Sequence, residues 1–281
     1  MALTTLKTAT LAVTTALGIW AQSAQAETLS KKETAIRIIQ NGLIEGDVHF
    51  INEYVAENYI QHNPQAPDGR DGLIGFTQYL ASQGTENTAT VVRALEQDDL
   101  VALHVIYEFG ENKIAAFDLF RFEDGIAVEH WDGLQPLATE TVSGRSMTDG
   151  PTKITDLDKT EENKAIVTGF VTDILVNGEF GKITDYIGDT YLQHNPNVGD
   201  GLDGLGVFVA YLQENNISFR YKKVHNVVAE GNFVMVQNEG EFGGKPTAFY
   251  DLFRVENGMI VEHWDTVQEI PEQMAHDNGM F

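Results

Sequence analysis

Hydrophobic residues recur three and four positions apart in the first part of the chain, which is the spacing of an amphipathic helix. We expect helices over residues 31–46, 47–58 and 72–82. The segment written QHNP, residues 61–64, lies between the last two. It is expected to be a loop because Pro64 disfavours helix at the residue before it.

Alternating apolar and polar residues follow these helices and predict strands. In the first half of the chain the expected strands lie near residues 88–96, 99–109, 113–122 and 126–135. The second half repeats the order, with strands near residues 217–229, 232–242, 246–255 and 259–268. Helices followed by antiparallel strands indicate an α+β fold, with the helices packed on one face of a curved sheet.

The chain contains an internal duplication. The segment YIQHNPQAPDGRDGLIGFTQYL, from Tyr59, matches YLQHNPNVGDGLDGLGVFVAYL, from Tyr191, at 13 of 22 positions with an offset of 132. The segment FDLFRFEDGIAVEHWDGLQ, from Phe117, matches YDLFRVENGMIVEHWDTVQ, from Tyr250, at 12 of 19 positions with an offset of 133. A repeat of about 110 residues is a domain rather than a solenoid unit.

The duplication predicts two domains, residues 30–137 and 159–269, joined by residues 138–158. The joining segment is polar, rich in Thr, Gly and Ser, and has no hydrophobic periodicity, which indicates a linker. Residues 270–281 are expected to form a tail with little structure of its own.

The first residues are typical of a secretory signal peptide. Lys7 supplies a short positive region, residues 9–20 are mostly apolar, and AQA, ending at Ala26, is a small-x-small cleavage site. The apolar run is short and rich in Thr, which disfavours a membrane span. We therefore expect a signal peptide over residues 1–26 and a periplasmic or secreted protein with no membrane anchor after cleavage.

Composition narrows the classes of partner. The chain has 281 residues, with 18 Lys and Arg against 42 Asp and Glu, and a formal net charge of −24. Nucleic acids and anionic membranes bind cationic surfaces, so both are unexpected partners. The absence of cysteine excludes disulfides, a thiol nucleophile and a zinc-thiolate site.

The turn between the last two strands of each domain decides which side chains share a face. We prefer a three-residue loop, Glu123–Gly125, because it separates apolar from charged residues and makes Asp118 oppose His130. The inner face then also carries Phe120, Phe122, Ile126 and Val128, and the outer face carries Arg121, Glu129 and Trp131. A two-residue turn would shift the register by one and put Asp118 opposite Trp131.

The second domain has the same arrangement in the preferred register. Asp251 would face His263, beside Phe253, Val255, Met259 and Val261, and Arg254 and Glu262 would share the outer face. Burying an Asp and a His in an apolar surrounding is costly without a function or a mutual hydrogen bond. One interpretation is a general acid/base pair in a pocket, with a pKa balanced between burial and the neighbouring charge. The other is a purely structural hydrogen bond, and the sequence does not decide between them.

The motifs YIQHNP…DGRDGLIGF and FDLFRFEDGIAVEHWD resemble the SnoaL-like polyketide cyclase family of the nuclear transport factor 2-like superfamily. The resemblance covers nearly all of both copies and is closest to the branch of aldol-condensation-catalysing proteins. It implies two tandem cone-shaped α+β barrels, each with three helices on a strongly curved, mostly antiparallel four-stranded sheet. The family fold encloses an apolar pocket and often dimerises through the sheet, which implies an internal pseudo-dimer of the two domains or a homodimer.

The resemblance also implies roles for particular residues. In the cyclases an Asp on a pocket strand removes a proton next to a carbonyl, which by position in the DLFR motif implies Asp118 and Asp251. A pocket His on the preceding strand assists in some members, which implies His104. The second copy has Gln237 at that place, which argues against two equivalent sites and favours the first if one copy alone is catalytic. The alternative is that both copies use only the Asp and the His of EHWD.

Other candidates lie near the QHNP motifs. His62 and His194 could reach the pocket mouth and assist proton transfer, or their loops could be held by hydrogen bonds from His and Asn side chains. The remaining candidates for the ligand pocket are Tyr59, Asn63, Phe120, Trp131, Tyr191, Asn195, Gln237, Phe253 and Trp264. The preferred register, however, places the two Trp residues on the outer face.

No cofactor is expected, because the chain has no nucleophile elbow, phosphate loop or dinucleotide fingerprint. No metal is expected either, since a His62, Asp118 and His130 site has no supporting spacing. Our first hypothesis is an exported, cofactor-independent enzyme that performs aldol-type cyclisation, isomerisation or hydrolysis on a small hydrophobic carbonyl compound. The second is a periplasmic protein that binds a small ligand or a partner without chemistry.

Overall fold

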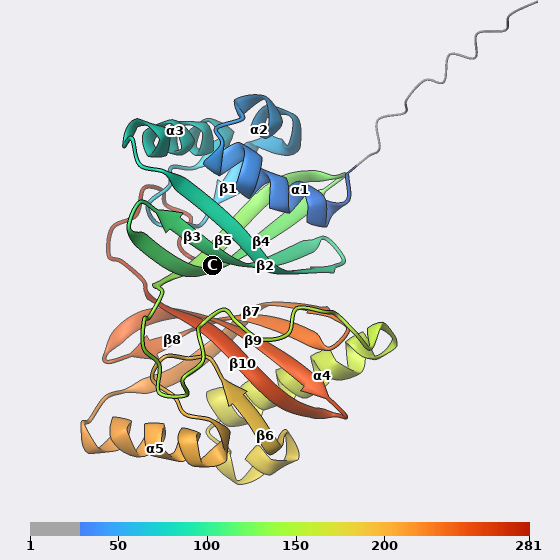
Figure 1. Cartoon of the computed structure of the whole chain (residues 1–281), viewed down its shortest axis with the longest axis vertical. Coiled ribbons are helices and arrows are strands. Elements are labelled where there is room, and N and C mark those ends of the chain that lie inside the picture. Colours follow the sequence, from blue (N-terminus) through green and yellow to red (C-terminus); the bar gives the residue numbers. More distant parts are fainter. Residues whose placement is uncertain (1–28) are drawn as a thin grey trace, which may run out of the picture.

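The computed structural model describes residues 29–281, which form two α+β domains stacked sheet to sheet (Figure 1). The signal peptide expected over residues 1–26 lies outside the described residues. No helix in the described part is long and apolar enough to cross a membrane. The matching halves of the fold confirm the tandem arrangement expected from the repeat.

The first domain begins with helices and ends with a sheet. Its helical segments are α1 (Lys31–Arg37), the π-helical η1 (Ile38–Ile44), α2 (Val48–Tyr54) and α3 (Gly69–Ser82). Its strands are β1 (Val55–Gln61), β2 (Asn87–Gln97), β3 (Leu100–Phe109), β4 (Asn112–Glu123) and β5 (Ile126–Pro136). The Ser30 and Glu33 side chains form a capping box that starts α1.

The second domain repeats this order after the linker. Its helical segments are η2 (Leu157–Lys159), α4 (Thr160–Phe170), η3 (Val171–Val176), η4 (Phe180–Asp185) and α5 (Gly201–Glu214). Its strands are β6 (Ile187–Gln193), β7 (Phe219–Glu230), β8 (Phe233–Phe242), β9 (Lys245–Glu256) and β10 (Met259–Glu269). The eight strands expected from the sequence therefore lie within a few residues of their expected bounds.

Each sheet has five strands rather than four and stays open rather than closing into a barrel. The strand orders are β1-β5-β4-β3-β2 and β6-β10-β9-β8-β7. The extra strand in the first domain is β1, which pairs in parallel with β5 and takes the place of the expected end of the second helix. Val55 and Tyr59 are both buried and four residues apart, a spacing that fits one face of a helix and equally one face of a strand.

The hairpin between β4 and β5 has the two-residue turn, so the preferred register was wrong. Asp124 and Gly125 both have positive φ, 49° and 81°, as a type I′ turn requires. A bulge at Val128 then shifts the pairing again, so that Asp118 opposes Asp132 instead of either expected partner. Ala127, rather than Ile126 or Val128, joins the inner core.

The bulge nevertheless keeps the expected division of polar residues. His130 and Asp118 both face inward, while Arg121 and Glu129 pair on the outer face at 2.8 Å. The second hairpin has the same two-residue turn and the same bulge, and Asp251 opposes Asp265 there. Ile260, in place of the expected Met259 and Val261, joins the inner core of the second domain.

A third hydrophobic core lies between the two sheets. Phe117, Leu119 and Trp131 from the first sheet pack against residues of the second, namely Tyr250, Leu252 and Trp264. Backbone N–H groups of Leu134 and Val267 donate to the side chains of Gln268 and Gln135 in the other domain, at 2.8 and 2.9 Å. The two bonds are related by the 133-residue offset of the repeat, so the interface is nearly symmetric.

The linker and the tail both have defined paths. The linker, which follows the first domain, packs on the second, and the tail, which follows the second domain, packs on the first. The linker packs on the QHNP loop of the second domain, where Val142 N donates to Pro196 O at 3.0 Å. The C-terminal tail, residues 270–281, returns to the equivalent loop of the first domain, where Ala275 N donates to Pro64 O at 2.9 Å (Figure 1). The tail has no regular helix or strand, as expected of a segment with little structure of its own, and its place is fixed by hydrogen bonds to the first domain.

Candidate functional site

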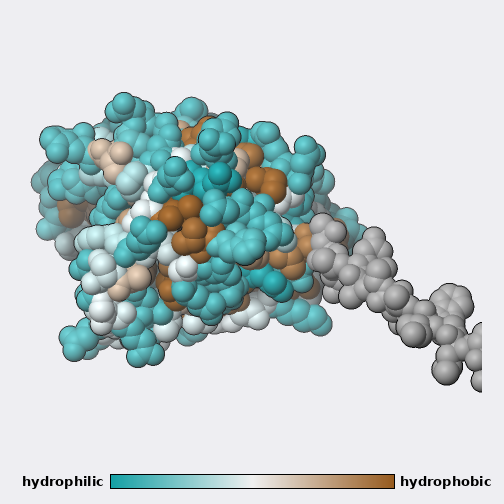
Figure 2. Space-filling model, turned by 90° about the horizontal axis from the view of Figure 1, so that it is seen from above, coloured by the Kyte–Doolittle hydropathy of each residue, from teal (hydrophilic) through white to brown (hydrophobic). Residues whose placement is uncertain are grey.

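A cavity of about 480 Å³ lies between the helices and the inner face of the sheet in the first domain. Most of its lining is apolar, including Ile38, Leu73, Phe76, Phe120 and Leu134. Figure 2 shows apolar side chains between hydrophilic ones on the face of this domain that carries the helices. The size and the apolar lining are typical of a small-molecule site.

The polar part of the lining is built around Asp118. Its carboxylate lies 3.1 Å from Nε2 of His130 and accepts a hydrogen bond from the hydroxyl of Tyr107, 3.0 Å from each oxygen. Both Asp118 and His130 are buried. The sequence therefore identified this pair and its orientation, although it missed Tyr107, which lies on β3.

The hydrogen bonds of Gln61 fix the protonation of the other ring nitrogen of His130. The side-chain oxygen of Gln61 accepts from the backbone N–H groups of His62 and Asn63, at 2.9 and 2.8 Å. The same oxygen lies 2.9 Å from Nδ1 of His130, so Nδ1 must be the donor. Nε2 and Asp118 therefore share the remaining proton, as an imidazolium–carboxylate pair or as a neutral pair.

Asp132 completes the polar cluster and was missed as a site residue in the sequence. Its Oδ2 accepts a hydrogen bond from the Asn63 side chain at 2.5 Å, and its Oδ1 is buried without a partner among the described residues. Burial raises the pKa of Asp132 to about 6, with the charge of His130 opposing the shift and that of Asp118 adding to it. The signal was present, since both copies end their repeated hairpin with this Asp in EHWD.

The second domain carries the same cluster with two differences, one of which is an added hydrogen bond from the Asn238 side chain to Asp251 at 2.8 Å. His263 lies 3.0 Å from Asp251, and burial raises the pKa of Asp265 to about 6. Burial lowers the pKa of His263, but the hydrogen bond that its ring donates to Asp251 and the charges of both Asp residues raise it more. The hydroxyl that donates to Asp251 belongs to Tyr221 on β7, whereas the hydroxyl that donates to Asp118 belongs to Tyr107 on β3, the counterpart of β8.

Larger side chains occupy the corresponding space in the second domain. Phe249 stacks on Tyr221 with ring centroids 4.4 Å apart, and Phe219 contacts both rings. The equivalent positions in the first domain are Asn87, Ala89 and Ala116. The first domain thus has a smaller or polar residue at Asn87 and Ala116, whereas the ring that Ala89 lacks is supplied by Tyr107 from the neighbouring strand; the acid/base cluster itself is present in both domains.

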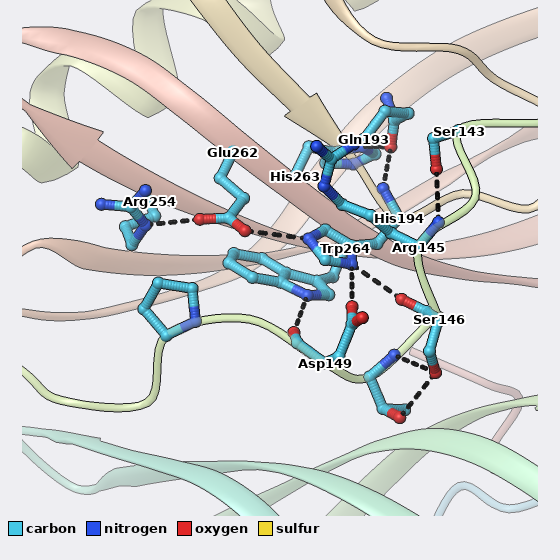
Figure 3. Close-up of polar contacts among 12 residues, drawn as sticks. Ser143, Arg145, Ser146, Asp149, Gln193, His194, Arg254, Glu262, His263 and Trp264 are labelled. Atoms are coloured by element: carbon cyan, nitrogen blue, oxygen red, sulfur yellow. Dashed lines mark hydrogen bonds and ion pairs between the residues drawn. The ribbon is translucent and has the colours of Figure 1, made fainter.

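His62 and His194 do not reach a pocket. His194 stacks on Trp264 at 4.6 Å, with Nε2 2.9 Å from Glu262 and Nδ1 2.7 Å from the carbonyl oxygen of Ser146 in the linker (Figure 3). His62 makes the equivalent contacts in the first domain, with Trp131, Glu129 and the carbonyl oxygen of Gly279 in the tail. Both nitrogens of each ring face acceptors, which an imidazolium satisfies.

His104 and Gln237 also lie outside the pocket, on the outer faces of β3 and β8. His104 stacks on Phe117 at 4.4 Å and accepts a hydrogen bond from Arg93 at 3.0 Å. Burial, with the charge of Arg93 adding to it, holds the pKa of His104 well below its usual range. Gln237 donates to the hydroxyl of Tyr250 at 2.8 Å. The expectation for β3 was wrong by face, because alternate residues of a strand point to opposite sides.

The remaining candidates divide by face in the same way. Tyr59, Asn63 and Phe120 line the cavity of the first domain. In the second domain Asn195 donates to Asp265 at 2.7 Å, and Tyr191 and Phe253 belong to the inner core. Trp131 and Trp264 lie in the core between the domains and not among the cavity-lining residues.

The residues that could hold a metal ion differ from the set considered in the sequence. One ligand atom from each of Asp118, His130 and Asp132 lies within 4.8 Å of the others, and Asp251, His263 and Asp265 form the same set. The His62 ring belongs to neither of these two sets, because it contacts Glu129 and the tail instead. Two carboxylates and an imidazole are a possible donor set for a divalent ion. An ion there would displace the proton that Nε2 of His130 shares with Asp118.

Comparison with known proteins agrees with this fold. The family model for the SnoaL-like domain matches residues 36–130 and again residues 167–263. The chain therefore belongs to the SnoaL-like family, as two tandem copies. A search of the curated proteins finds no match.

Several solved structures align with part of the chain. TsrD from Streptomyces laurentii is 17% identical with a TM-score of 0.34, over 37% of this chain and 88% of TsrD. IdmH from Streptomyces antibioticus, a proposed polyketide cyclase, is 23% identical with a TM-score of 0.33, over 38% of this chain and 93% of IdmH. An NTF2-like protein of unknown function from Cytophaga hutchinsonii is 14% identical with a TM-score of 0.33, over 38% and 91%.

The raised pKa of Asp132 predicts a pH dependence of stability that the variant Asp132→Asn removes. A carboxyl group with a pKa of about 6 in the folded state stabilises the fold fully below the unfolded pKa of about 3.9, and this stabilisation is lost as pH rises through 6. Relative to Asp132→Asn, the wild type should lose about 1 kcal/mol of unfolding free energy between pH 5 and pH 8. Urea unfolding at both pH values measures this. A difference that does not change with pH would show that Asp132 titrates like an ordinary Asp.

Proposed function

We propose that the first domain binds a small hydrophobic carbonyl compound and removes a proton next to its carbonyl group, with Asp132 as the base. The observation that supports this most directly is the unpartnered oxygen of Asp132 at an apolar cavity. A base with a pKa near 6 is largely ionised at neutral pH, yet it still accepts a proton readily. Membership of a family that includes polyketide cyclases supports the same class of chemistry.

The assignment moves the base from Asp118 to Asp132 because Asp118 is already engaged. The Asp118 carboxylate accepts from Tyr107 and shares a proton with His130, so it has less freedom to accept another proton. In this proposal Asp118 holds His130 in place, and His130 balances the charge beside Asp132. The substrate proton passes to Oδ1 of Asp132, and the electron pair of the broken C–H bond moves onto the carbonyl oxygen.

Tyr59 is suited to stabilise that oxygen. It lines the cavity, and its hydroxyl makes no hydrogen bond to any of the described residues. Burial, with the charges of Asp118 and Asp132 adding to it, raises the pKa of Tyr59 well above its usual range, so the hydroxyl stays protonated as a donor. The resulting enolate could attack a second carbonyl, as in an aldol cyclisation, or take the proton back at another carbon, as in an isomerisation.

The charge of the cavity points to a neutral ligand. Asp118 and Asp132 line it, while none of the lining residues is Lys or Arg. A carboxylate or phosphate on the ligand would find no Lys or Arg there, His130 is already engaged by Asp118, and the two Asp residues would repel the ligand's charge. The amide side chains of Gln83, Asn87 and Asn112 also line the cavity and could hydrogen-bond a hydroxyl or carbonyl group.

A panel of small neutral ketones in D₂O provides a test of proton abstraction without knowledge of the natural substrate. Wild-type protein should catalyse deuterium incorporation at the carbon next to the carbonyl, detected by proton NMR, and Asp132→Asn should lower the rate at least a hundredfold. Asp265→Asn in the second domain is the matched control and should keep the rate. Exchange that survives Asp132→Asn would refute the base assignment. Ketone binding without exchange would instead support the alternative function, a ligand-binding protein without chemistry.

The cavity can be closed by giving the first domain the side chain of the second. Ala116→Phe places a ring where the second domain has Phe249, and Asn87→Phe places one where it has Phe219. Either change should weaken binding of a neutral fluorescent probe such as Nile red at least tenfold. Binding unchanged in both variants would show that the probe, and by extension the ligand, uses another surface. The reverse change, Phe249→Ala, should cost about 3–5 kcal/mol of stability because it leaves a void in a packed core.

We also propose that the protein is exported and processed after Ala26. This rests on the positive, apolar and small-x-small pattern of residues 1–26. Expression of the full chain in a bacterium should yield a periplasmic or secreted form whose measured mass corresponds to a start at Glu27. An unprocessed chain that stays in the cytoplasm would contradict the proposal.

A further inference from the structure

The C-terminal tail makes a hydrogen bond to every residue of the QHNP loop in the first domain. Asn278 donates from its side chain to Gln61 O at 3.0 Å, and His276 donates to Asn63 O at 2.9 Å. Between these, the His62 ring donates to Gly279 O at 2.9 Å. Ala275 N completes the set with its bond to Pro64 O. Four consecutive loop residues are thus held by a segment that follows the last strand of the other domain.

Two of these loop residues directly position the acid/base cluster. The side-chain oxygen of Gln61 accepts from Nδ1 of His130, and the Asn63 side chain donates to Asp132. Asn278 also donates to Asp68 at 2.8 Å, and Asp68 in turn accepts from Gln61 N at 2.9 Å. The tail therefore fixes the backbone on both sides of the Gln61 side chain.

The linker offers an internal comparison, because it lies on the second domain in the same way. Arg145 reaches Asp200 at 2.5 Å where Asn278 reaches Asp68, and Ser146 O accepts from His194 where Gly279 O accepts from His62. Met147 and Met280 are both buried one residue further on. In the described part of the chain, however, no linker bond reaches the carbonyl oxygens of Gln193 or Asn195.

We propose that residues 274–281 are a positioning element for the acid/base site of the first domain, with Asn278 and His276 as its positioning residues. The tail holds the loop so that Gln61 and Asn63 orient His130 and Asp132. Its two additional bonds are made only on the domain that keeps a cavity. The inference rests on the function proposed above, but its geometric part, the coupling of the tail to His130, does not require that function.

The test compares His276→Ala/Asn278→Ala with Arg145→Ala, which removes a linker contact on the other domain. The first readout is the Nδ1–H resonance of His130, which should exchange slowly with solvent because it is buried and bonded to Gln61. We expect the tail variant to speed this exchange at least tenfold and to lower the rate of ketone deuteration at least tenfold, with KM changed less than threefold. Arg145→Ala should leave both unchanged.

The outcomes separate the two proposals. If the His130 resonance changes in the tail variant but no protein deuterates a ketone, the positioning inference holds and the proposed chemistry fails. If the tail variant and Arg145→Ala only lower the melting temperature, and the resonance stays the same, the tail merely joins the domains and the inference is overturned. Should the double variant fail to fold, Asn278→Ala alone is measured against the same criteria.

Discussion

The side-chain oxygen of Gln61 carries much of the site, because three hydrogen bonds end on it. Two come from the backbone of the QHNP loop and one from His130. The first two fix the loop, and the third fixes which nitrogen of His130 carries a proton and so what Asp118 can do. Gln193 accepts the same three bonds in the second domain. An oxygen shared in this way cannot move without disturbing loop, ring and carboxylate together.

The sequence predicted those features of the fold that are encoded by neighbouring residues or by direct repetition. Strand bounds followed from local alternation and the repeat from matching residues at a constant offset, and both were found, as was the inward orientation of Asp118 and His130. The predicted register was wrong because it depends on a bulge at Val128. The bulge adds one unpaired residue to β5, and the alternation of apolar and polar residues does not show where that residue lies. His104 and the QHNP histidines failed for a related reason, since the second sheet buries the outer face as well, and burial alone no longer identifies the pocket side. Alternation already places Asp132 on the same face as His130, two residues earlier, but this Asp was not considered as a site residue.

The two copies separate what the fold requires from what a ligand requires. Both keep the His between two Asp residues, the Gln that orients it and a Tyr hydroxyl on the first Asp, although the Tyr comes from β3 in one copy and β7 in the other. Since the second copy keeps this cluster with aromatic rings beside it, the cluster alone does not indicate catalysis. The difference lies in Asn87 and Ala116, which leave space in the first copy where the second has Phe219 and Phe249. The polar cluster is thus common to both copies, and the cavity is what makes the cluster of the first copy a candidate ligand-binding site.

The linker covers a loop of the second domain and the tail covers the equivalent loop of the first. This arrangement explains how the site of one copy could change without the site of the other. Their contacts are related by the same 133-residue offset as the strands, yet in the segments that cover the loops, residues 145–148 and 278–281, Met147 and Met280 are the one identical pair. In a symmetric pair of identical chains, both loops would be covered by the same sequence, and a change in one would appear in the other. In a fused pair each loop has its own cover. The tail can then supply His276 and Asn278 to the loop beside the open cavity, while the linker, which must also connect the domains, makes fewer bonds to the loop beside the filled one.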